Sequence, residues 1–199
     1  MKVPAILLAA GGSRRLGHPK QLVCIAGENM LARTIRVVRE AGVSPVFVVT
    51  GSHHEDMSPT LQTPGVVEVH NADWESGIAS SIRSGVHHVL TAAPDAVGAL
   101  LLVCDQPRLS AQLVVELLAT FALARGSSIV ASEYAGVRGI PAIFPAAQFD
   151  GLLALVGDEG ARHLLRDSHC PPVVVPFEGG EVDLDTPRDI SAIETMEID

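Results

Sequence analysis

Basic residues are scarce in this chain of 199 residues: 14 lysines and arginines stand against 23 aspartates and glutamates, for a formal net charge of -9. Proteins that bind nucleic acid mainly through its phosphates carry a basic surface. We therefore expect no nucleic-acid partner. Aromatic residues are also few, at 4%, but hydrophobic residues reach 47%, which is enough for an ordinary core. We expect one domain that spans residues 1–199.

Cysteine is equally sparse. The three cysteines are odd in number, have unrelated spacings and include no CxxC pair; they are Cys24, Cys104 and Cys170. This pattern favours neither a disulfide framework nor a zinc site, and the reducing cytoplasm is the expected compartment. Because Cys104 lies in an apolar run with no obvious base beside it, we interpret it as a buried structural thiol.

Long apolar runs are missing at the amino terminus. The first residues, MKVPAILLAAGG, are apolar but far too short to span a membrane, and they lead into a glycine and arginine segment where a signal peptide would have a cleavage site. We expect neither export nor a membrane partner.

Metal-binding histidine spacing is absent as well. The eight histidines include the pairs His53-His54 and His87-His88, but no HExxH pattern occurs. We therefore interpret all eight as surface or structural residues.

What the chain does have is an alternation of short apolar runs with longer segments of helical period. Helices are predicted after two capping residues, Asn29 and Ser110. Runs such as AILLAA and GALLLVC do not alternate with polar residues, which is typical of strands covered on both faces in a mainly parallel sheet. Strands are predicted at residues 3–9, 46–50, 66–70, 99–104, 129–133, 142–144 and 173–175.

The alternation predicts an α/β fold whose ligands gather at the carboxyl ends of the strands. Residues 51–65 are expected to form a loop or one short helix. Residues 182–190, VDLDTPRDI, predict a short strand followed by a helix that Thr186 caps, so that Asp183 and Asp185 lie at the junction.

A glycine and arginine segment directly follows the first predicted strand. Residues 10–20, AGGSRRLGHPK, combine glycines, a serine, two arginines and a lysine. Glycines allow consecutive backbone amides to converge on an anion, while arginine and lysine contact phosphate oxygens. The segment is neither a P-loop nor a dinucleotide fingerprint. The alternative interpretation is a flexible turn with solvated arginines, but the combination of groups favours a phosphate loop.

The same segment matches the signature LAAGxSxRxGxxK and resembles the nucleotidyltransferase domain of molybdenum cofactor cytidylyltransferases and guanylyltransferases. All fixed positions are filled, by Leu8, Ala9, Ala10, Gly11, Ser13, Arg15, Gly17 and Lys20. The resemblance implies a three-layer, Rossmann-like nucleotide-diphospho-sugar transferase fold, a nucleoside triphosphate substrate and release of pyrophosphate. The Ala-Ala-Gly form resembles the cytidylyl branch, which implies CTP.

Two acidic residues are candidates for a magnesium ion. Asp105 follows an apolar run in the segment CDQP, and Asp185 lies in DLDTPRD, which resembles the late family motif DIDTPxD. Mg²⁺ takes one or two carboxylates together with phosphate oxygens and water. For Asp105 the alternative is a turn or capping role, and for Asp183 and Asp185 it is helix-end electrostatics.

The family resemblance also assigns nucleotide contacts. Beyond the loop, the predicted contacts come from the segment around Gly77. The alternative for this segment is a helix start with ordinary serine caps. Trp74 is interpreted as a residue that packs in the core. The predicted nucleotide-binding residues are Leu8, Ala9, Ala10, Gly11, Gly12, Ser13, Arg15, Lys20, Asn71, Gly77, Ser80, Ser81 and Asp105.

Two later segments resemble acceptor-binding elements of the cytidylyl branch. RGIP at 138–141 resembles GxP, and GDEGAR at 157–162 resembles GDxGAR, although Ile140 stands where the family often has a polar residue. A surface role is the alternative for Arg162. The predicted acceptor-binding residues are Arg138, Gly139, Pro141, Asp158 and Arg162.

The predicted reaction is Mg²⁺-dependent transfer of a nucleoside monophosphate to a phosphorylated acceptor, with Arg15, Lys20 and Asp105 as catalytic residues. The resemblance implies molybdopterin as acceptor and a molybdoenzyme or maturation protein as partner. Other acceptors in the enzyme class are sugar or polyol phosphates and sugar 1-phosphates, and guanylyl transfer to the same pterin is a further alternative. The alternative outside the enzyme class is a nucleotide-binding accessory domain without turnover.

Overall fold

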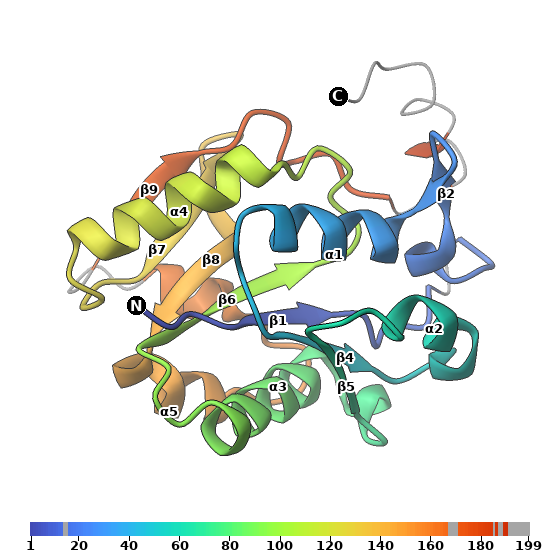
Figure 1. Cartoon of the computed structure of the whole chain (residues 1–199), viewed down its shortest axis with the longest axis horizontal. Helices are drawn as coiled ribbons and strands as arrows, with labels where there is room; N and C mark the ends of the chain where they lie inside the picture. Colours follow the sequence, from blue (N-terminus) through green and yellow to red (C-terminus); the bar gives the residue numbers. More distant parts are fainter. Residues whose placement is uncertain (14–15, 167–170, 185, 187–188, 191–199) are drawn as a thin grey trace.

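A seven-stranded, mostly parallel sheet forms the centre of the computed structural model, which describes residues 1–13, 16–166, 171–184, 186 and 189–190. Figure 1 shows helices on both faces of this sheet. The strand order is β5-β4-β1-β6-β8-β7-β9. The strands are β1 (Ala5–Leu8), β4 (Val46–Thr50), β5 (Val66–His70), β6 (Gly98–Val103), β7 (Val130–Tyr134), β8 (Val137–Pro145) and β9 (Val173–Pro176).

Most neighbouring strands are parallel, as the apolar runs predicted. β1 pairs in parallel with β4 and β6, and β4 does so with β5. β8 is antiparallel to both β6 and β7, which the sequence analysis did not foresee. It is also much longer than the predicted 142–144, because its amino-terminal half pairs with β7 through the tight turn at Ala135 and Gly136.

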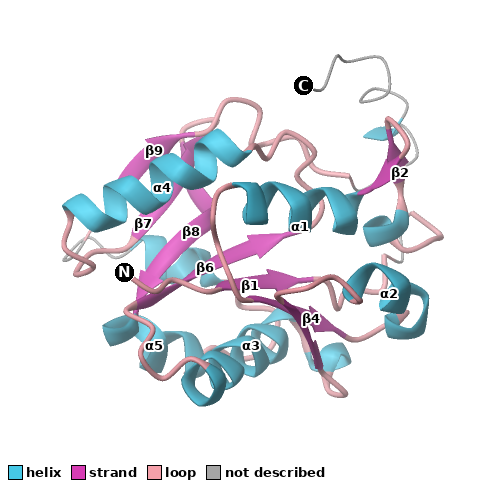
Figure 2. Ribbon diagram, in the orientation of Figure 1, coloured by secondary structure: helices cyan, strands magenta, loops and turns pink. Residues whose placement is uncertain are grey.

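The central strands are buried on both faces because their side chains alternate between two cores. Leu7 packs on one side with α1 (Met30–Glu40), α2 (His54–Leu61) and α4 (Ala111–Leu123). Ile6 and Leu8 pack on the other with α3 (Ile78–Ala92) and α5 (Phe149–Leu153). Helix, sheet and helix form three layers, which confirms the predicted Rossmann-like α/β architecture (Figure 2).

Both predicted helix caps are confirmed. The side chain of Asn29 accepts a hydrogen bond of 2.8 Å from the backbone N–H of Ala32, and that of Ser110 accepts one of 3.2 Å from Leu113. Each bond satisfies a donor that the first helical turn leaves without an intrahelical partner. Residues 51–65 contain the one short helix that the sequence allowed, α2.

Smaller elements surround the sheet. A two-stranded antiparallel ribbon, β2 and β3, leads directly into α1. The small elements are β2 (Cys24–Ile25), β3 (Glu28–Asn29) and the 3₁₀ helices η1 (Lys20–Leu22), η2 (Trp74–Ser76), η3 (Ala146–Gln148) and η4 (Ala161–Arg166).

The predicted strand before Thr186 is wrong, because residues 182–184 join no strand. Leu184 is instead buried beside Met30, and its backbone N–H donates to the carbonyl oxygen of Asp105 at 3.0 Å. The Asp189 carboxylate accepts hydrogen bonds from the N–H and the hydroxyl of Thr186, at 2.7 and 2.9 Å, as the acidic residue of a capping box does, while residues 187–188 of the predicted helix lie outside the described residues.

Helices long and apolar enough to cross a membrane are absent from the described part of the chain.

Candidate active site

Lys20 and Asp105 form an ion pair at the carboxyl end of the sheet. Lys20 begins η1 after the glycine segment that follows β1, and Asp105 lies two residues beyond β6, the parallel neighbour of β1. The Lys20 ammonium donates to Asp105 Oδ2, with both side chains mostly buried. Parallel strands end at the same edge, so this topology brings together two residues that are far apart in sequence.

A cleft of about 430 Å³ opens over this pair, and we call it the loop cleft. It lies between the segment after β1, the end of β6 and the start of α3. Several predicted nucleotide-binding residues line it, namely Leu8, Ala10, Gly11, Lys20, Gly77, Ser81 and Asp105. Of the other predicted residues, Ala9, Gly12, Ser13, Asn71 and Ser80 do not line it, and Arg15 lies outside the described residues.

A second cavity of about 310 Å³ adjoins the loop cleft, and we call it the side cavity. Asp158 and Asp105 line both hollows, together with Leu8, Ile78 and Val103. Gln106, Tyr134 and Arg162 line the side cavity but not the loop cleft. The Asp105 carboxylate therefore stands at the junction of two spaces, an arrangement suited to two substrates that react with each other.

Gln21, which sequence reasoning missed, fixes the shape of the glycine segment. Its buried side-chain amide donates to the carbonyl oxygens of Ala9 and Gly11, at 2.7 and 3.0 Å. Ser13 accepts a 2.9 Å hydrogen bond from the backbone N–H of Lys20 through its hydroxyl oxygen. Ala9 and Ser13 thus hold the shape of the loop without lining the loop cleft. The only sequence signal for Gln21 is its place directly after Lys20.

Gln106 plays a matching role on the other side of Asp105. Its amide donates to the carbonyl oxygens of Ile140 and Gly180, at 3.1 and 3.0 Å. These bonds join the end of β6 to β8 and to the segment after β9. Gln106 belongs to the CDQP segment, in which only its neighbour Asp105 was predicted as a site residue.

Asn71 and Ser80 organise the start of α3. The buried Asn71 amide donates to the hydroxyl oxygens of Ser80 and Ser81, at 2.9 and 3.0 Å, and the Ser80 hydroxyl donates to the Gly77 carbonyl at 2.8 Å. The backbone N–H of Asp73 in turn donates to Asn71 Oδ1. The network orients Ser81 and Gly77 toward the loop cleft, so Asn71 contributes through its neighbours.

Trp74 is half-buried and lines the loop cleft, whereas the sequence interpretation placed it in the core. Its ring is packed against two glycines: a Cβ added at Gly12 would lie 3.1 Å from Trp74 Cη2, and one at Gly51 would lie 2.6 Å from Cγ. Glycine at both positions leaves room for the indole, which closes the cleft beside the glycine segment.

Gly77 allows the segment that begins at Gly157 to pack closely against the start of α3. The backbone N–H of Ala79 donates to the Gly157 carbonyl at 3.1 Å, and a Cβ on Gly77 would lie 2.2 Å from that oxygen. With a φ of 107°, Gly77 also adopts a backbone conformation that L side chains rarely adopt. The close approach places Asp158 at the junction of the two cavities.

The predicted acceptor residues divide between two hollows. Asp158 and Arg162 line the side cavity, and Gly139 and Pro141 do not. Arg138 lines a separate hollow of about 390 Å³ that also contains Arg162 and Arg166, and we call it the basic pocket. Arg162 therefore connects the side cavity to a hollow lined by three arginines and one carboxylate, that of Glu133, and it lies in the short 3₁₀ helix η4.

Asp105 has the features of a cation ligand. Its Oδ1 atom is buried and has no hydrogen-bond partner among the described residues, a state that is unfavourable unless a cation or water satisfies the oxygen. Asp183 lines the side cavity, and Leu184 is bonded to the Asp105 backbone. Asp185, the second predicted ligand, lies outside the described residues. The donor set fits a divalent metal that prefers oxygen.

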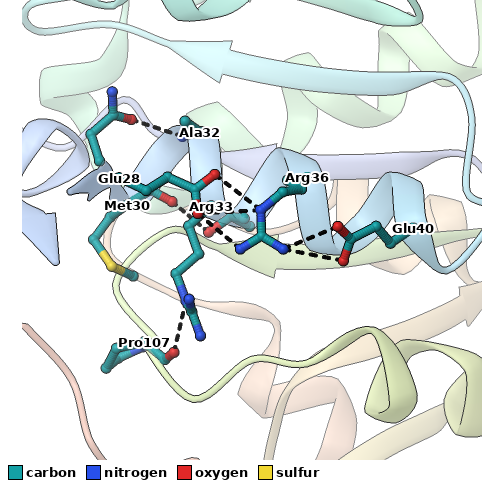
Figure 3. A network of polar contacts seen from close by, with 9 residues as sticks. Glu28, Met30, Ala32, Arg33, Arg36, Glu40 and Pro107 are labelled. Atoms are coloured by element: carbon teal, nitrogen blue, oxygen red, sulfur yellow. Dashed lines mark hydrogen bonds and ion pairs between the residues drawn. The ribbon is translucent and has the colours of Figure 1, made fainter. Parts of the chain in front are cut away.

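A polar network on α1 anchors the loop that carries Asp105 (Figure 3). Arg33 Nε donates to the Pro107 carbonyl at 3.2 Å, from the α1 turn that also carries Arg36. Arg36 is held between Glu28 and Glu40, and its hydrogen bonds lower the pKa of Glu28. Arg33 thus joins α1 to the backbone two residues after Asp105.

Cys104 is not a nucleophile in this site. Its side chain is fully buried next to Asp105, and burial raises the pKa of the thiol to about 12. A neutral thiol is a poor nucleophile, which agrees with the structural role expected from the sequence.

Residues 5–173 match the family described as the MobA-like NTP transferase domain. The chain belongs to this family. The match covers the glycine segment, the Lys20–Asp105 pair, the loop cleft and the side cavity apart from Asp183. It makes the protein a nucleotidyltransferase, in agreement with the resemblance carried by the loop motif.

Relatives of this MobA-like protein have varied names. The chain is 32% identical to the purine catabolism protein PucB of Bacillus subtilis, over 94% of both chains. It is 30% identical to nicotine blue oxidoreductase of Paenarthrobacter nicotinovorans, over 98% of this chain and 94% of that protein. A probable molybdenum cofactor guanylyltransferase of Opitutus terrae is 29% identical over 70% of this chain and 64% of its own.

Solved structures agree in fold. Rv0371c from Mycobacterium tuberculosis has a TM-score of 0.82 and 26% identity, over 98% of this chain and all of the other. A manganese complex of the same protein has a TM-score of 0.78 and 25% identity, with the same coverage. The manganese in the second structure belongs to that relative.

Proposed function

We propose that this MobA-like protein transfers CMP from CTP to a phosphorylated acceptor, most specifically molybdopterin, with release of pyrophosphate. The observation that best supports this proposal is the pair of adjoining cavities that share Asp105. CTP would occupy the loop cleft, and the acceptor would reach it from the side cavity.

Each predicted catalytic or metal-binding group has a distinct role in this proposal. Lys20 places a positive charge beside the α-phosphate and the incoming acceptor oxygen. The backbone amides around Gly11 bind the outer phosphates, together with Arg15. Asp105, with Asp185, would hold Mg²⁺, which when bound neutralises phosphate charge.

The reaction is an in-line displacement. An oxygen of the acceptor phosphate attacks the α-phosphorus of CTP, the new P–O bond forms, and the bond to the β-phosphate oxygen breaks, so pyrophosphate leaves. A phosphate monoester is already an anion near neutral pH and needs little help from a general base. Rate enhancement then comes from alignment and charge stabilisation, for which the buried ion pair and the loop amides are suited.

The basic pocket supports an anionic acceptor. Arg162 borders both this pocket and the side cavity, and Arg138 and Arg166 add to its positive charge. Guanidinium groups bind phosphate oxygens in pairs. Molybdopterin is chosen as the acceptor because probable molybdenum cofactor guanylyltransferases are among the relatives.

CTP is chosen over GTP because of the Ala9-Ala10-Gly11 sequence, which resembles the cytidylyl branch. The guanylyltransferases among the relatives make GTP the alternative. Thermal-shift titration with CTP, GTP, UTP and ATP, each with Mg²⁺, separates the two, since a ligand that binds the native state raises the melting temperature with saturation.

Pyrophosphate release with molybdopterin as acceptor completes the test. We expect turnover with CTP and Mg²⁺ that is at least tenfold faster than with GTP. Faster turnover with GTP would replace CTP in the proposal, and no release with any triphosphate would refute the proposed reaction. Arg162→Gln and Arg138→Gln should raise the KM for the acceptor and leave the KM for CTP unchanged.

A further inference from the structure

We propose that His54, Glu68 and His70 form a second metal site, for a borderline transition ion of the Zn²⁺ class. One ligand atom from each of these three side chains lies within 4.8 Å of the others. None of the three lines the loop cleft or the side cavity. The site is therefore independent of the proposed nucleotidyl transfer.

The backbone holds the three ligands in place from two elements. Glu68 and His70 are two residues apart on β5, so their side chains lie on the same face of the strand. His54 is the first residue of α2, which precedes β5 in the chain. The sequence analysis interpreted these histidines as surface or structural residues because no metal-binding spacing occurs along the chain. The three ligands instead come from one helix and one strand that pack together.

The side chains already face one another. The ring centroids of His54 and His70 are 4.4 Å apart, and His54 Nδ1 lies 3.9 Å from Glu68 Oε1. Around a tetrahedral zinc ion, with bonds of about 2.0 to 2.2 Å, donor atoms are roughly 3.3 to 3.5 Å apart. His70 and Glu68 are exposed and His54 is half-buried, so small side-chain rotations close the difference.

The donor set selects the class of ion. Imidazole nitrogen suits zinc, copper and nickel, whereas Mg²⁺ and Ca²⁺ prefer all-oxygen sites. Two imidazoles and a carboxylate make a zinc-type set whose fourth position is taken by water. Thr50 supports it from the next strand, because its buried hydroxyl donates to Glu68 Oε1 at 2.7 Å and orients the carboxylate.

The ion would join α2 to β5 at a place where α2 is weakly anchored. The helix begins after His53, which has a left-handed φ of 59° and makes no side-chain capping bond. Ser52, just before it, donates its backbone N–H to the Ala10 carbonyl at 3.2 Å. A metal at His54 would thus stabilise the segment that supports the glycine loop from outside.

The test is Zn²⁺ titration by calorimetry on tag-free protein, in excess Mg²⁺ so that the oxygen site at Asp105 is saturated. A Cys24→Ser background removes a thiol that is exposed among the described residues and could compete as a ligand. We expect one equivalent of Zn²⁺ with a micromolar or lower Kd, and Co²⁺ substitution should give the visible spectrum of a nitrogen and oxygen site. His54→Ala and His70→Ala should each weaken binding at least tenfold, and Thr50→Val roughly tenfold.

Two histidine variants outside the cluster serve as matched controls. His53→Asn keeps a residue type tolerant of the left-handed backbone next to the site, and His87→Ala removes an exposed histidine on α3. Both should bind Zn²⁺ as the parent does. Absence of a stoichiometric site in the parent, or unchanged affinity in His54→Ala and His70→Ala, overturns the proposal. If a histidine variant fails to fold, Glu68→Gln replaces it in the test, because this substitution is nearly isosteric and lies at an exposed residue. Unchanged Zn²⁺ affinity in Glu68→Gln then overturns the proposal.

Discussion

The ammonium of Lys20 and the carboxylate of Asp105 meet at the carboxyl end of two adjacent parallel strands, although 85 residues separate them in the chain. The other oxygen of this carboxylate is buried and has no hydrogen-bond partner among the described residues. Asp105 can therefore serve two charged groups at once, the lysine on one side and a cation on the other.

Removal of either charge should abolish most turnover and keep the fold. Lys20→Met and Asp105→Asn each remove a contact to developing charge, and such contacts are worth about 3 to 4 kcal/mol, or roughly a hundredfold to a thousandfold in kcat. Pyrophosphate release measures the loss, and circular dichroism verifies the fold. Normal turnover in both variants would show that the pair is structural.

Gly11→Ala should weaken nucleotide binding at little cost in stability. A Cβ at Gly11 meets nothing within 4 Å, and the residue lines the loop cleft. The methyl group would occupy space needed by the triphosphate, so we expect the KM for the nucleotide to rise roughly tenfold. Thermal unfolding should change little, and an unchanged KM would place the phosphates elsewhere.

Gly77→Ala should destabilise the protein. The new Cβ would lie 2.2 Å from the Gly157 carbonyl oxygen, and φ is 107°. This nearly glycine-only backbone region costs about 1 to 3 kcal/mol for other residues and overpacking costs about 1 to 3 kcal/mol, so we expect a loss of about 2 to 6 kcal/mol in urea unfolding. Gly160→Ala is the matched control, because its Cβ meets nothing within 4 Å. Equal stability of the two variants would contradict the close approach.

Cys104 should resist alkylation in the native protein. With a pKa raised to about 12 by burial, only about one thiol in ten thousand is ionised at pH 8. Cys24 is exposed and should react. Iodoacetamide labelling followed by peptide mass spectrometry measures both sites, and urea should make Cys104 reactive. Rapid labelling of native Cys104 would show that the strand end opens.

Glu28→Gln should reduce stability at neutral pH and have less effect in acid. Hydrogen bonds from Arg36 lower the pKa of Glu28 below its ordinary value of 4.5. The stabilisation is therefore complete above the ordinary value and is lost as pH falls through the lower, folded value. Because the pair is largely exposed, we expect less than about 1 kcal/mol. Urea unfolding of both proteins at about pH 7 and about pH 3 measures the difference, which should shrink at the lower pH.

The sequence by itself determined the layered fold. Apolar runs without alternation predicted β1, β4 and β6 because buried parallel strands need hydrophobic side chains on both faces. Local hydrogen bonding determined the caps Asn29 and Ser110, since each bond joins residues three apart. The loop motif predicted the family, because phosphate binding by backbone amides depends on glycines and charges that are close in sequence.

Only the tertiary structure decided which residues meet. The two cavities that share Asp105, the place of Trp74 against Gly12, and the joining of His54 to His70 all depend on how β1, β5, β6 and the helices pack. Leu184 illustrates the reason: its segment was predicted as a strand, but burial beside Met30 and a bond to Asp105 replaced a sheet ladder. Such contacts join residues distant in the chain, and no local pattern records them.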